Sequence, residues 1–162
     1  FRVYPIGILH TPFKSSKGTP IQPVFSDELG TATVFDDFIG GLESLDGFSH
    51  IYLFYFCHRA KSYSLKVKPY LDDREHGVFS TRSPSRPNPI GFSLVEMISI
   101  DENIISFRGA DMLDETPLLD IKPYVTRFDH QEEATTGWLE EALKKQGKEK
   151  QADSRFEKSS TD

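Results

Sequence analysis

Short apolar and β-branched runs, each ended by proline, glycine or other turn-forming residues, limit the possible folds of this chain more than any other feature. The strongest run is residues 51–57, Ile-Tyr-Leu-Phe-Tyr-Phe-Cys, whose length and aromatic content favour a strand buried on both faces. A hairpin is expected over residues 95–108, with its turn at Asp101, Glu102 and Asn103. Further short strands are expected at residues 2–9, 31–35, 64–70 and 118–125.

One helix is convincing, at residues 136–145, where Trp138, Leu139, Ala142 and Leu143 share one face. A count of about six to seven mostly antiparallel strands predicts a mainly β fold, a single small β-barrel that is closed or nearly closed. The length of 162 residues leaves little room for a second domain. We therefore expect a barrel domain over residues 1–129, then a C-terminal helix and a charged, partly disordered tail over residues 130–162, frayed beyond residue 147.

The cysteine and histidine content excludes several kinds of site. The single cysteine, Cys57, rules out an internal disulfide framework, and we expect it to be a small buried hydrophobe rather than a nucleophile. His10, His76 and His130 do not have metal-ligand spacing, so we predict no catalytic metal. No apolar run is long enough to span a bilayer and the first residues do not resemble a signal peptide, so we expect a cytoplasmic protein.

The charge balance argues against indiscriminate binding to nucleic acid. The net charge is −6 and the pI about 5.4, whereas such binding usually needs a basic surface. Residues 59–86 are the exception, with seven Lys or Arg against three acidic residues. Any contact with a polyanion is expected there, although scattered charges on a solvated loop are the simpler interpretation.

Residues 77–91 are the first segment that carries chemistry. Prolines at positions 84, 87 and 89 restrict the backbone and produce a stiff, non-helical loop. This loop presents Arg82, Arg86 and Asn88, and rigid loops with charged and amide groups often build sites. A proline-rich structural connector is an equally good interpretation of this segment alone.

Residues 111–124 are the second such segment, with Asp111, Asp114, Glu115, Asp120 and Lys122 between apolar residues. Carboxylates along a strand edge could bind a ribose, an ammonium group or a metal. A turn stabilised by aspartate side chains is the alternative, and it would be favoured without the first segment.

Together these two strings resemble the TrmO/TsaA-like family. The strings Thr-Arg-Ser-Pro-x-Arg-Pro-Asn-Pro-Ile-Gly at 81–91 and Leu-Asp-x-Thr-Pro-Leu-Leu-Asp-Ile-Lys-Pro-Tyr at 113–124 carry the likeness. Residues 5–7 and 45–50 fit the same pattern, in one register over residues 3–129. The resemblance implies a tRNA adenosine-37 N6-methyltransferase, with S-adenosylmethionine as donor, a small β-barrel and a homodimer. It also suggests that adenosine 37 first carries a threonylcarbamoyl group.

No Gly-x-Gly-x-x-Gly follows a strand, so a Rossmann-type cofactor loop is absent from the sequence. Arg82 could bind the cofactor carboxylate through its planar fork, while Asp111 and Asp114 could accept hydrogen bonds from its ammonium or ribose. Carried over by motif, the family's cofactor contacts fall at Pro20, Ile21, Gln22, His58, Arg59, Arg82, Phe92, Asp111, Met112, Leu113 and Asp114.

Methyl transfer mainly requires the amine nitrogen to be held behind the methyl carbon. Asn88 is the candidate acceptor for that amine, since Asn-Pro-Ile resembles the Asn/Asp-Pro-Pro-aromatic motif of unrelated amino-methyltransferases. Asp120 and Tyr124 are alternative catalytic partners, and Arg86 or Lys122 could contact RNA phosphate. The side chains that could stack on loop bases are His50, His58 and Tyr70.

Two other functions stay open from the sequence. One is the same cofactor chemistry on a small molecule or another RNA. The other is a non-catalytic barrel that binds a nucleotide or a protein partner. Glu115 stands where the family often has glycine, which is expected to alter the turn.

Overall fold

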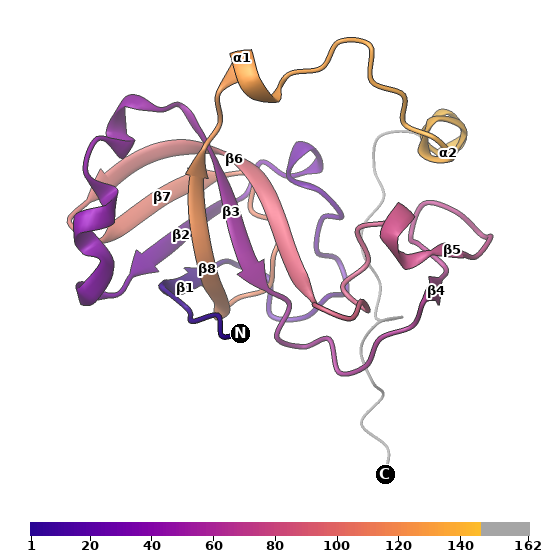
Figure 1. The fold of residues 1–162 in the computed structure, drawn as a ribbon, viewed down its shortest axis with the longest axis horizontal. Coiled ribbons are helices and arrows are strands. Elements are labelled where there is room, and N and C mark those ends of the chain that lie inside the picture. The colour runs from indigo at the N-terminus through magenta and orange to yellow at the C-terminus, as the bar shows by residue number, and fades with distance from the viewer. Residues whose placement is uncertain (147–162) are drawn as a thin grey trace.

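The centre of the molecule is a closed barrel of six antiparallel strands (Figure 1). The structure is a computed structural model and describes residues 1–146. The strand order around the barrel is β1-β2-β7-β6-β3-β8, which confirms the predicted mainly β, single-barrel fold. The strands are β1 Gly7–His10, β2 Leu29–Val34, β3 His50–Phe56, β6 Ile90–Asp101, β7 Ile104–Arg108 and β8 Thr116–Pro123.

Short helices and one small sheet complete the described chain, and none of its helices is long and apolar enough to cross a bilayer. The small sheet pairs β4 Lys66–Val67 with β5 His76–Gly77. The 3₁₀ helices are η1 Pro23–Phe25, η2 Asp36–Leu42, η3 Leu45–Gly47 and η4 Val78–Ser80, and the α-helices are α1 Thr126–Asp129 and α2 Leu139–Gln146.

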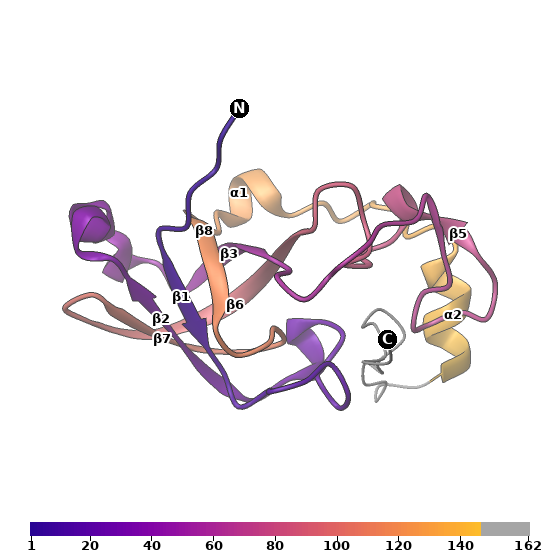
Figure 2. The ribbon, with the colours of Figure 1, turned by 90° about the horizontal axis from the view of Figure 1, so that it is seen from below.

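Residues 57–89, which we call the insertion, leave the barrel after β3 and return to it at β6. They carry β4, β5 and η4 and lie beside the barrel, with α2 against them in both views (Figures 1 and 2). The Trp138 ring stacks on His76 with centroids 4.2 Å apart. Its Nε1 donates a hydrogen bond to the Ser80 carbonyl at 2.9 Å. The C-terminal helix is therefore attached to the insertion.

The core follows from the two-residue alternation of β-strands. In β3, Ile51, Leu53 and Tyr55 point into the barrel and are buried, whereas Tyr52 and Phe54 point outward and are partly exposed. The expectation that this strand is buried on both faces was wrong, because a barrel strand has only one face toward the core. The largest fully buried apolar side chains are Phe107, Leu9, Ile51, Leu53, Ile105, Leu118, Val34, Val78 and Val95.

Several element boundaries differ from those expected. The predicted strand at 64–70 shortens to β4, and β6 begins at Ile90 because that residue still pairs with Phe56. The helix expected from residue 136 begins at Leu139, since Gly137 has a φ of 57°, in the left-handed region. The predicted fraying beyond residue 147 lies outside the described residues.

Gly7 provides a test of the barrel packing. It pairs with Val34 of β2, and a Cβ at position 7 would lie 2.3 Å from the Thr33 carbonyl oxygen. Because backbone cannot yield as a flexible side chain does, we predict that Gly7→Ala lowers the free energy of unfolding by about 3 kcal/mol. Urea denaturation measures this loss. Gly40→Ala is the matched control, since a Cβ there meets nothing within 4 Å. Equal stability of the two variants would contradict the packing argument.

Candidate functional site

An open cleft of about 1470 Å³ lies between the barrel and the insertion. Its walls come from the loop after β1, from β3 and β6, from the insertion, and from the loop after β7, with Trp138 and α2 at one side. Both chemistry-bearing segments, 77–91 and 111–124, contribute residues to this one cleft. The barrel thus brings together two stretches that are separated in the sequence by residues 92–110.

Most of the predicted site residues line the cleft. Asn88 and Arg86 lie on it, as do all the predicted cofactor residues except Asp114. Asp114, Asp120, Lys122 and Tyr124 are not among its lining residues. The predicted cofactor residues that line the cleft are Pro20, Ile21, Gln22, His58, Arg59, Arg82, Phe92, Asp111, Met112 and Leu113.

The side chain of Asp114 holds the loop that follows β1. Its Oδ1 accepts a hydrogen bond from the Thr11 backbone N–H at 3.1 Å, and its Oδ2 accepts one from the Lys14 ammonium. The Lys14 hydrogen bond lowers the pKa of Asp114, more strongly than burial raises it. Asp114 therefore shapes the turn beside the cleft. The next residue, Glu115, has a φ of 60°, the conformation that glycine adopts most readily.

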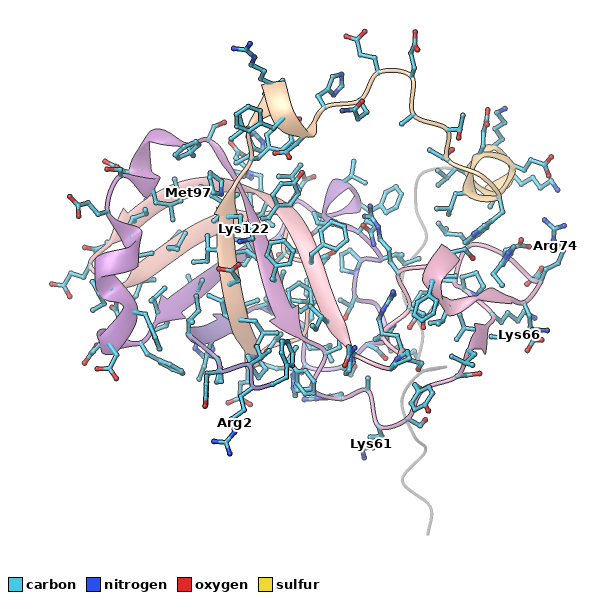
Figure 3. The ribbon with its side chains drawn as sticks, in the orientation of Figure 1. Arg2, Lys61, Lys66, Arg74, Met97 and Lys122 are labelled. Atoms are coloured by element: carbon cyan, nitrogen blue, oxygen red, sulfur yellow. The ribbon has the colours of Figure 1, made fainter. Side chains whose placement is uncertain are left out.

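Asp120 and Lys122 lie on the outer surface of the barrel, where their side chains form an ion pair with a distance of 2.9 Å. Figure 3 shows Lys122 on β8, on the side of the barrel facing the viewer. Asp120 Oδ1 also accepts a hydrogen bond from the Ile121 backbone N–H at 2.9 Å. Any part these two residues play would be in contacts outside the cleft.

Aromatic side chains form a continuous strip on the outer faces of β3, β6 and the end of β8. We call His50, Tyr52, Phe54, Phe92 and Tyr124 the aromatic strip. Phe54 stacks on Phe92 with centroids 6.2 Å apart, and Tyr52 meets Tyr124 edge-on at 5.9 Å. Because His50, Tyr52 and Phe92 also line the cleft, the strip leads from Tyr124 into the cleft mouth.

Buried hydroxyl groups stiffen the loop that carries Arg82, in addition to its prolines. Thr81 Oγ1 donates to the Val78 carbonyl at 2.8 Å and accepts from the Ser83 backbone N–H at 3.3 Å. Arg86 Nη1 donates back to the Thr81 carbonyl at 3.0 Å. Arg86 therefore helps to hold its own loop in shape, although it also lies on the cleft.

Arg82 is exposed and lines the cleft. Its Nη1 donates a hydrogen bond to Gln22 Oε1, and its guanidinium lies 4.7 Å from the centre of the Phe92 ring. A guanidinium over a ring face is attracted by the ring's negative face while its N–H donors stay available. Arg82 is thus a pre-positioned cation beside an aromatic surface.

Asp111 is the most perturbed carboxylate of the cleft. Its Oδ1 accepts a hydrogen bond from Ser93 Oγ at 2.6 Å, and Ser93 Oγ lies 3.0 Å from the Tyr55 hydroxyl. Burial raises the pKa of Asp111 to about 7, although Ser93 and the positive charge of Arg82 act in the opposite direction. No ion pair of Asp111 occurs within residues 1–146, so the cleft contains a carboxylate without a fixed counter-ion.

Two further groups on the cleft are neutral near pH 7. Burial, together with the charge of Asp111, raises the pKa of Cys57 to about 11, which agrees with an unreactive thiol. Burial and then Arg59 lower the pKa of His58, whose Nδ1 lies 3.3 Å from Thr116 Oγ1. Across the described part of the chain, no three His, Cys, Asp or Glu side chains cluster as metal ligands do.

The sequence did not identify Tyr55 and Trp138 as residues that line the cleft, or Ser93 as the buried partner of Asp111 behind it. Tyr55 lies within the most apolar run and was assigned to the core. Ser93 is a polar residue at an inward-facing position of a strand, which is the one signal that could have drawn attention to it. Trp138 was placed on the apolar face of a helix, and only the packing of that helix on the insertion brings it to the cleft.

Comparison with known proteins adds a second line of observation. A family model described as the tRNA-methyltransferase O N-terminal domain matches residues 8–130. A probable S-adenosyl-L-methionine-binding protein of Pyrococcus abyssi is 51% identical over 142 residues, which cover 87% of this chain and 77% of that protein. A Homo sapiens protein named tRNA (adenine(37)-N6)-methyltransferase is 36% identical over 133 residues, 77% of this chain and 30% of that protein.

Solved structures show the same fold. TrmO from Pseudomonas aeruginosa superposes with a TM-score of 0.72 at 33% identity, covering 85% of this chain and 62% of that one. Another TrmO crystal structure superposes with a TM-score of 0.74 at 36% identity, covering 85% of this chain and 63% of that one. This chain thus spans less than two thirds of the length of the solved structures that it resembles.

The raised pKa of Asp111 makes the stability of the protein depend on pH. Burial moves that pKa from 3.8 to about 7 in the folded chain. Between these values the folded state binds a proton that the unfolded state has released, so the free energy of unfolding falls as the pH rises through this window. We predict that Asp111→Asn removes this loss and is more stable than wild type at pH 8, by on the order of 2–4 kcal/mol.

Urea unfolding at pH 4 and pH 8 measures the effect, and the two proteins should differ little at pH 4. Asp36→Asn, which changes an exposed carboxylate, is the control and should follow the wild type at both pH values. Equal stability of Asp111→Asn and wild type at pH 8 would contradict a buried, proton-binding Asp111.

Proposed function

The chain belongs to the family of the tRNA-methyltransferase O N-terminal domain, and on that premise we propose that it transfers a methyl group from S-adenosylmethionine to N6 of adenosine 37 in a tRNA anticodon loop. The observation that carries the proposal is the cleft itself, where Arg82, Phe92 and Asp111 combine a cation, an aromatic ring and a buried carboxylate. The names of the relatives point the same way.

The residues of the cleft fit S-adenosylmethionine in chemical type. Its carboxylate requires a cation, which Arg82 offers. Its ammonium and sulfonium groups require negative charge, and Asp111 has no counter-ion within residues 1–146. Its adenine requires a flat apolar surface, which Phe92 and the backbone around Met112 and Leu113 offer. When bound, this cofactor supplies an electrophilic methyl carbon on a sulfonium.

Asn88 is the residue that we propose to hold the acceptor amine. Its loop is fixed to the barrel, because the Pro89 carbonyl accepts a hydrogen bond from the Cys57 backbone N–H at 2.7 Å. The Asn88 carbonyl in turn accepts from the Ile90 backbone N–H at 2.7 Å. An amide side chain on such a rigid loop can orient an exocyclic amine and accept charge as the new bond forms. Asp120 and Tyr124 are proposed only for contacts with the RNA outside the cleft.

The RNA surface that we propose has two parts. The aromatic strip leads into the cleft mouth and could stack unpaired bases of the anticodon loop. The insertion supplies cations for phosphates, among them Lys61, Lys66 and Arg74, which Figure 3 shows along its outer side, away from the barrel. Lys122 beside the strip is a further candidate for a phosphate contact. The proposed phosphate contacts thus come from cations on one part of the surface, which is compatible with a net charge of −6 for the whole chain.

We extend the proposal to the acceptor, the assembly and the compartment. That adenosine 37 already carries a threonylcarbamoyl group is proposed from the family resemblance. A homodimer in the cytoplasm is proposed from the family resemblance. We also propose residues 1–129 as the methyltransferase domain, with residues 130–162 as a C-terminal extension that contributes Trp138 to the cleft.

Arg82→Ala tests the cofactor site. Because a charge-assisted hydrogen bond to a carboxylate is worth about 1.5–3 kcal/mol, we predict that the variant binds S-adenosylmethionine at least about tenfold more weakly. Isothermal titration calorimetry measures the affinity. Arg74→Ala is the control, since Arg74 pairs with Asp72 and does not line the cleft. Unchanged affinity in Arg82→Ala would remove this residue from the site.

Asn88→Ala tests the reaction. The recombinant chain is incubated with S-adenosylmethionine and tRNA with or without threonylcarbamoyladenosine at position 37, and the nucleosides are identified by mass spectrometry. We predict N6-methylation by the wild type and a turnover about 100-fold lower for Asn88→Ala, with cofactor affinity unchanged. Asn88→Asp, which keeps an acceptor oxygen, should retain more activity than the alanine variant. Absence of methylation of either tRNA would contradict the proposed function.

A further inference from the structure

Three polar side chains are joined behind the wall of the cleft: Tyr55 on β3 and Asp111 after β7 both line the cleft, and the buried Ser93 on β6 links them. Ser93 is 1% exposed, and its hydroxyl donates to Asp111 Oδ1 at 2.6 Å. When Asp111 is ionised its oxygen can only accept, so the single proton of the Ser93 hydroxyl goes to Asp111 and the 3.0 Å contact is donated by the Tyr55 hydroxyl. Both hydroxyl groups therefore direct their protons toward the Asp111 carboxylate.

Gly91 makes this arrangement possible. Tyr55 and Gly91 are directly paired between β3 and β6, and Ser93 lies two residues further along β6 on the same face. A Cβ at position 91 would lie 2.3 Å from Cε2 of the Tyr55 ring. Because Gly91 has no side chain, the Tyr55 ring can lie across β6 and bring its hydroxyl to Ser93.

We propose that Tyr55 and Ser93 are positioning residues that act through Asp111, presenting its carboxylate to a cationic group bound in the cleft. The inference rests on the proposed binding of S-adenosylmethionine, which carries an ammonium and a sulfonium. Hydroxyl donors stabilise the ionised carboxylate and fix which oxygen stays available to the cleft. Without them burial would favour the protonated, neutral form, which has little attraction for a cation.

The charges around Asp111 support this role. Burial raises its pKa to about 7. The Ser93 hydrogen bond and the positive charge of Arg82 lower it, but by less. Tyr55 on β3 and Cys57, the first residue of the insertion, stay neutral because burial raises the pKa of each. The positive charge of Arg86 lowers the pKa of Cys57, but by less than burial raises it.

His58 also lines the cleft, and burial lowers its pKa. Among these described groups Asp111 is therefore the one whose ionisation is balanced near neutral pH.

A consequence for binding follows. When a cation binds beside protonated Asp111, the carboxyl proton is released to the buffer and the carboxylate stays in the cleft. Binding should therefore release protons near pH 7 and weaken at lower pH, by up to about tenfold for each pH unit. Variants that lose a hydroxyl donor should need a higher pH to reach the same affinity.

The first experiment follows the Asp111 carboxyl carbon by ¹³C NMR during a pH titration of the protein alone, with Asp111→Asn identifying its signal. Ser93→Ala should raise the titration midpoint by about one pH unit, and Tyr55→Phe should raise it by less, since Tyr55 acts only through Ser93. Ser93→Thr keeps the hydroxyl and should return the midpoint toward wild type. Ser106→Ala and Tyr63→Phe remove hydroxyl groups that do not line the cleft and should leave it unchanged.

The second experiment measures S-adenosylmethionine binding by calorimetry from pH 6 to pH 8, in two buffers with different enthalpies of protonation. Wild type should release protons on binding, and the affinity curves of Ser93→Ala and Tyr55→Phe should shift to higher pH. The amino group of free S-adenosylmethionine titrates in the same way in every experiment. Differences in proton release between variants therefore come from the protein.

The outcomes separate the two proposals. Unchanged Asp111 midpoints in both Ser93→Ala and Tyr55→Phe would overturn the positioning role, whether or not the cofactor binds. A second outcome is that the midpoints shift but cofactor affinity is independent of pH and binding releases no protons. This would overturn the presentation of Asp111 to a cation and would leave the proposed function intact. Failure of wild type to bind S-adenosylmethionine would overturn both the proposed function and the cationic partner. The NMR titration would still decide whether Tyr55 and Ser93 position Asp111.

Discussion

The pairing of β3 with β6 on one side and β8 on the other is the constraint on which the site depends. It closes the barrel, and it fixes Tyr55 opposite Gly91 on one neighbour and Leu118 on the other. On the inward face of β3, Ile51 and Leu53 pack in the core, whereas the Tyr55 hydroxyl contacts Ser93 behind the cleft. Most of the inward-facing residues of β3 thus stabilise the core, whereas Tyr55, near the end that leads into the insertion, contributes to the site.

Burial and function oppose one another at Asp111. An aspartate on a cleft wall costs free energy to ionise, which is why its pKa stands at about 7. A more stable protein would have a neutral residue there, but a neutral residue offers nothing to a cation. The hydroxyl groups of Ser93 and Tyr55 offset part of the cost without supplying a counter-ion, so the carboxylate stays available for a ligand.

The insertion and the C-terminal helix add walls to the barrel surface and so form the open cleft. The proline-rich loop returns to the barrel beside β3, and Trp138 fixes α2 to the insertion through His76 and Ser80. The sequence predicted this loop as a site because proline geometry is local. It could not predict the contribution of Trp138, because the partner of an apolar helix face is decided by packing across more than fifty residues.

The sequence by itself determined the antiparallel barrel, since strand length, alternation and turn residues are properties of neighbouring positions. It also identified the residues of the Arg82 loop and of the Asp111 segment, which one cleft unites. Only the tertiary structure decided that Asp114, Asp120 and Tyr124 lie off that cleft, that Tyr55 lines it and that Ser93 joins Tyr55 to Asp111. The physical reason is that register and strand pairing, which no local pattern specifies, set which side chains meet across the barrel.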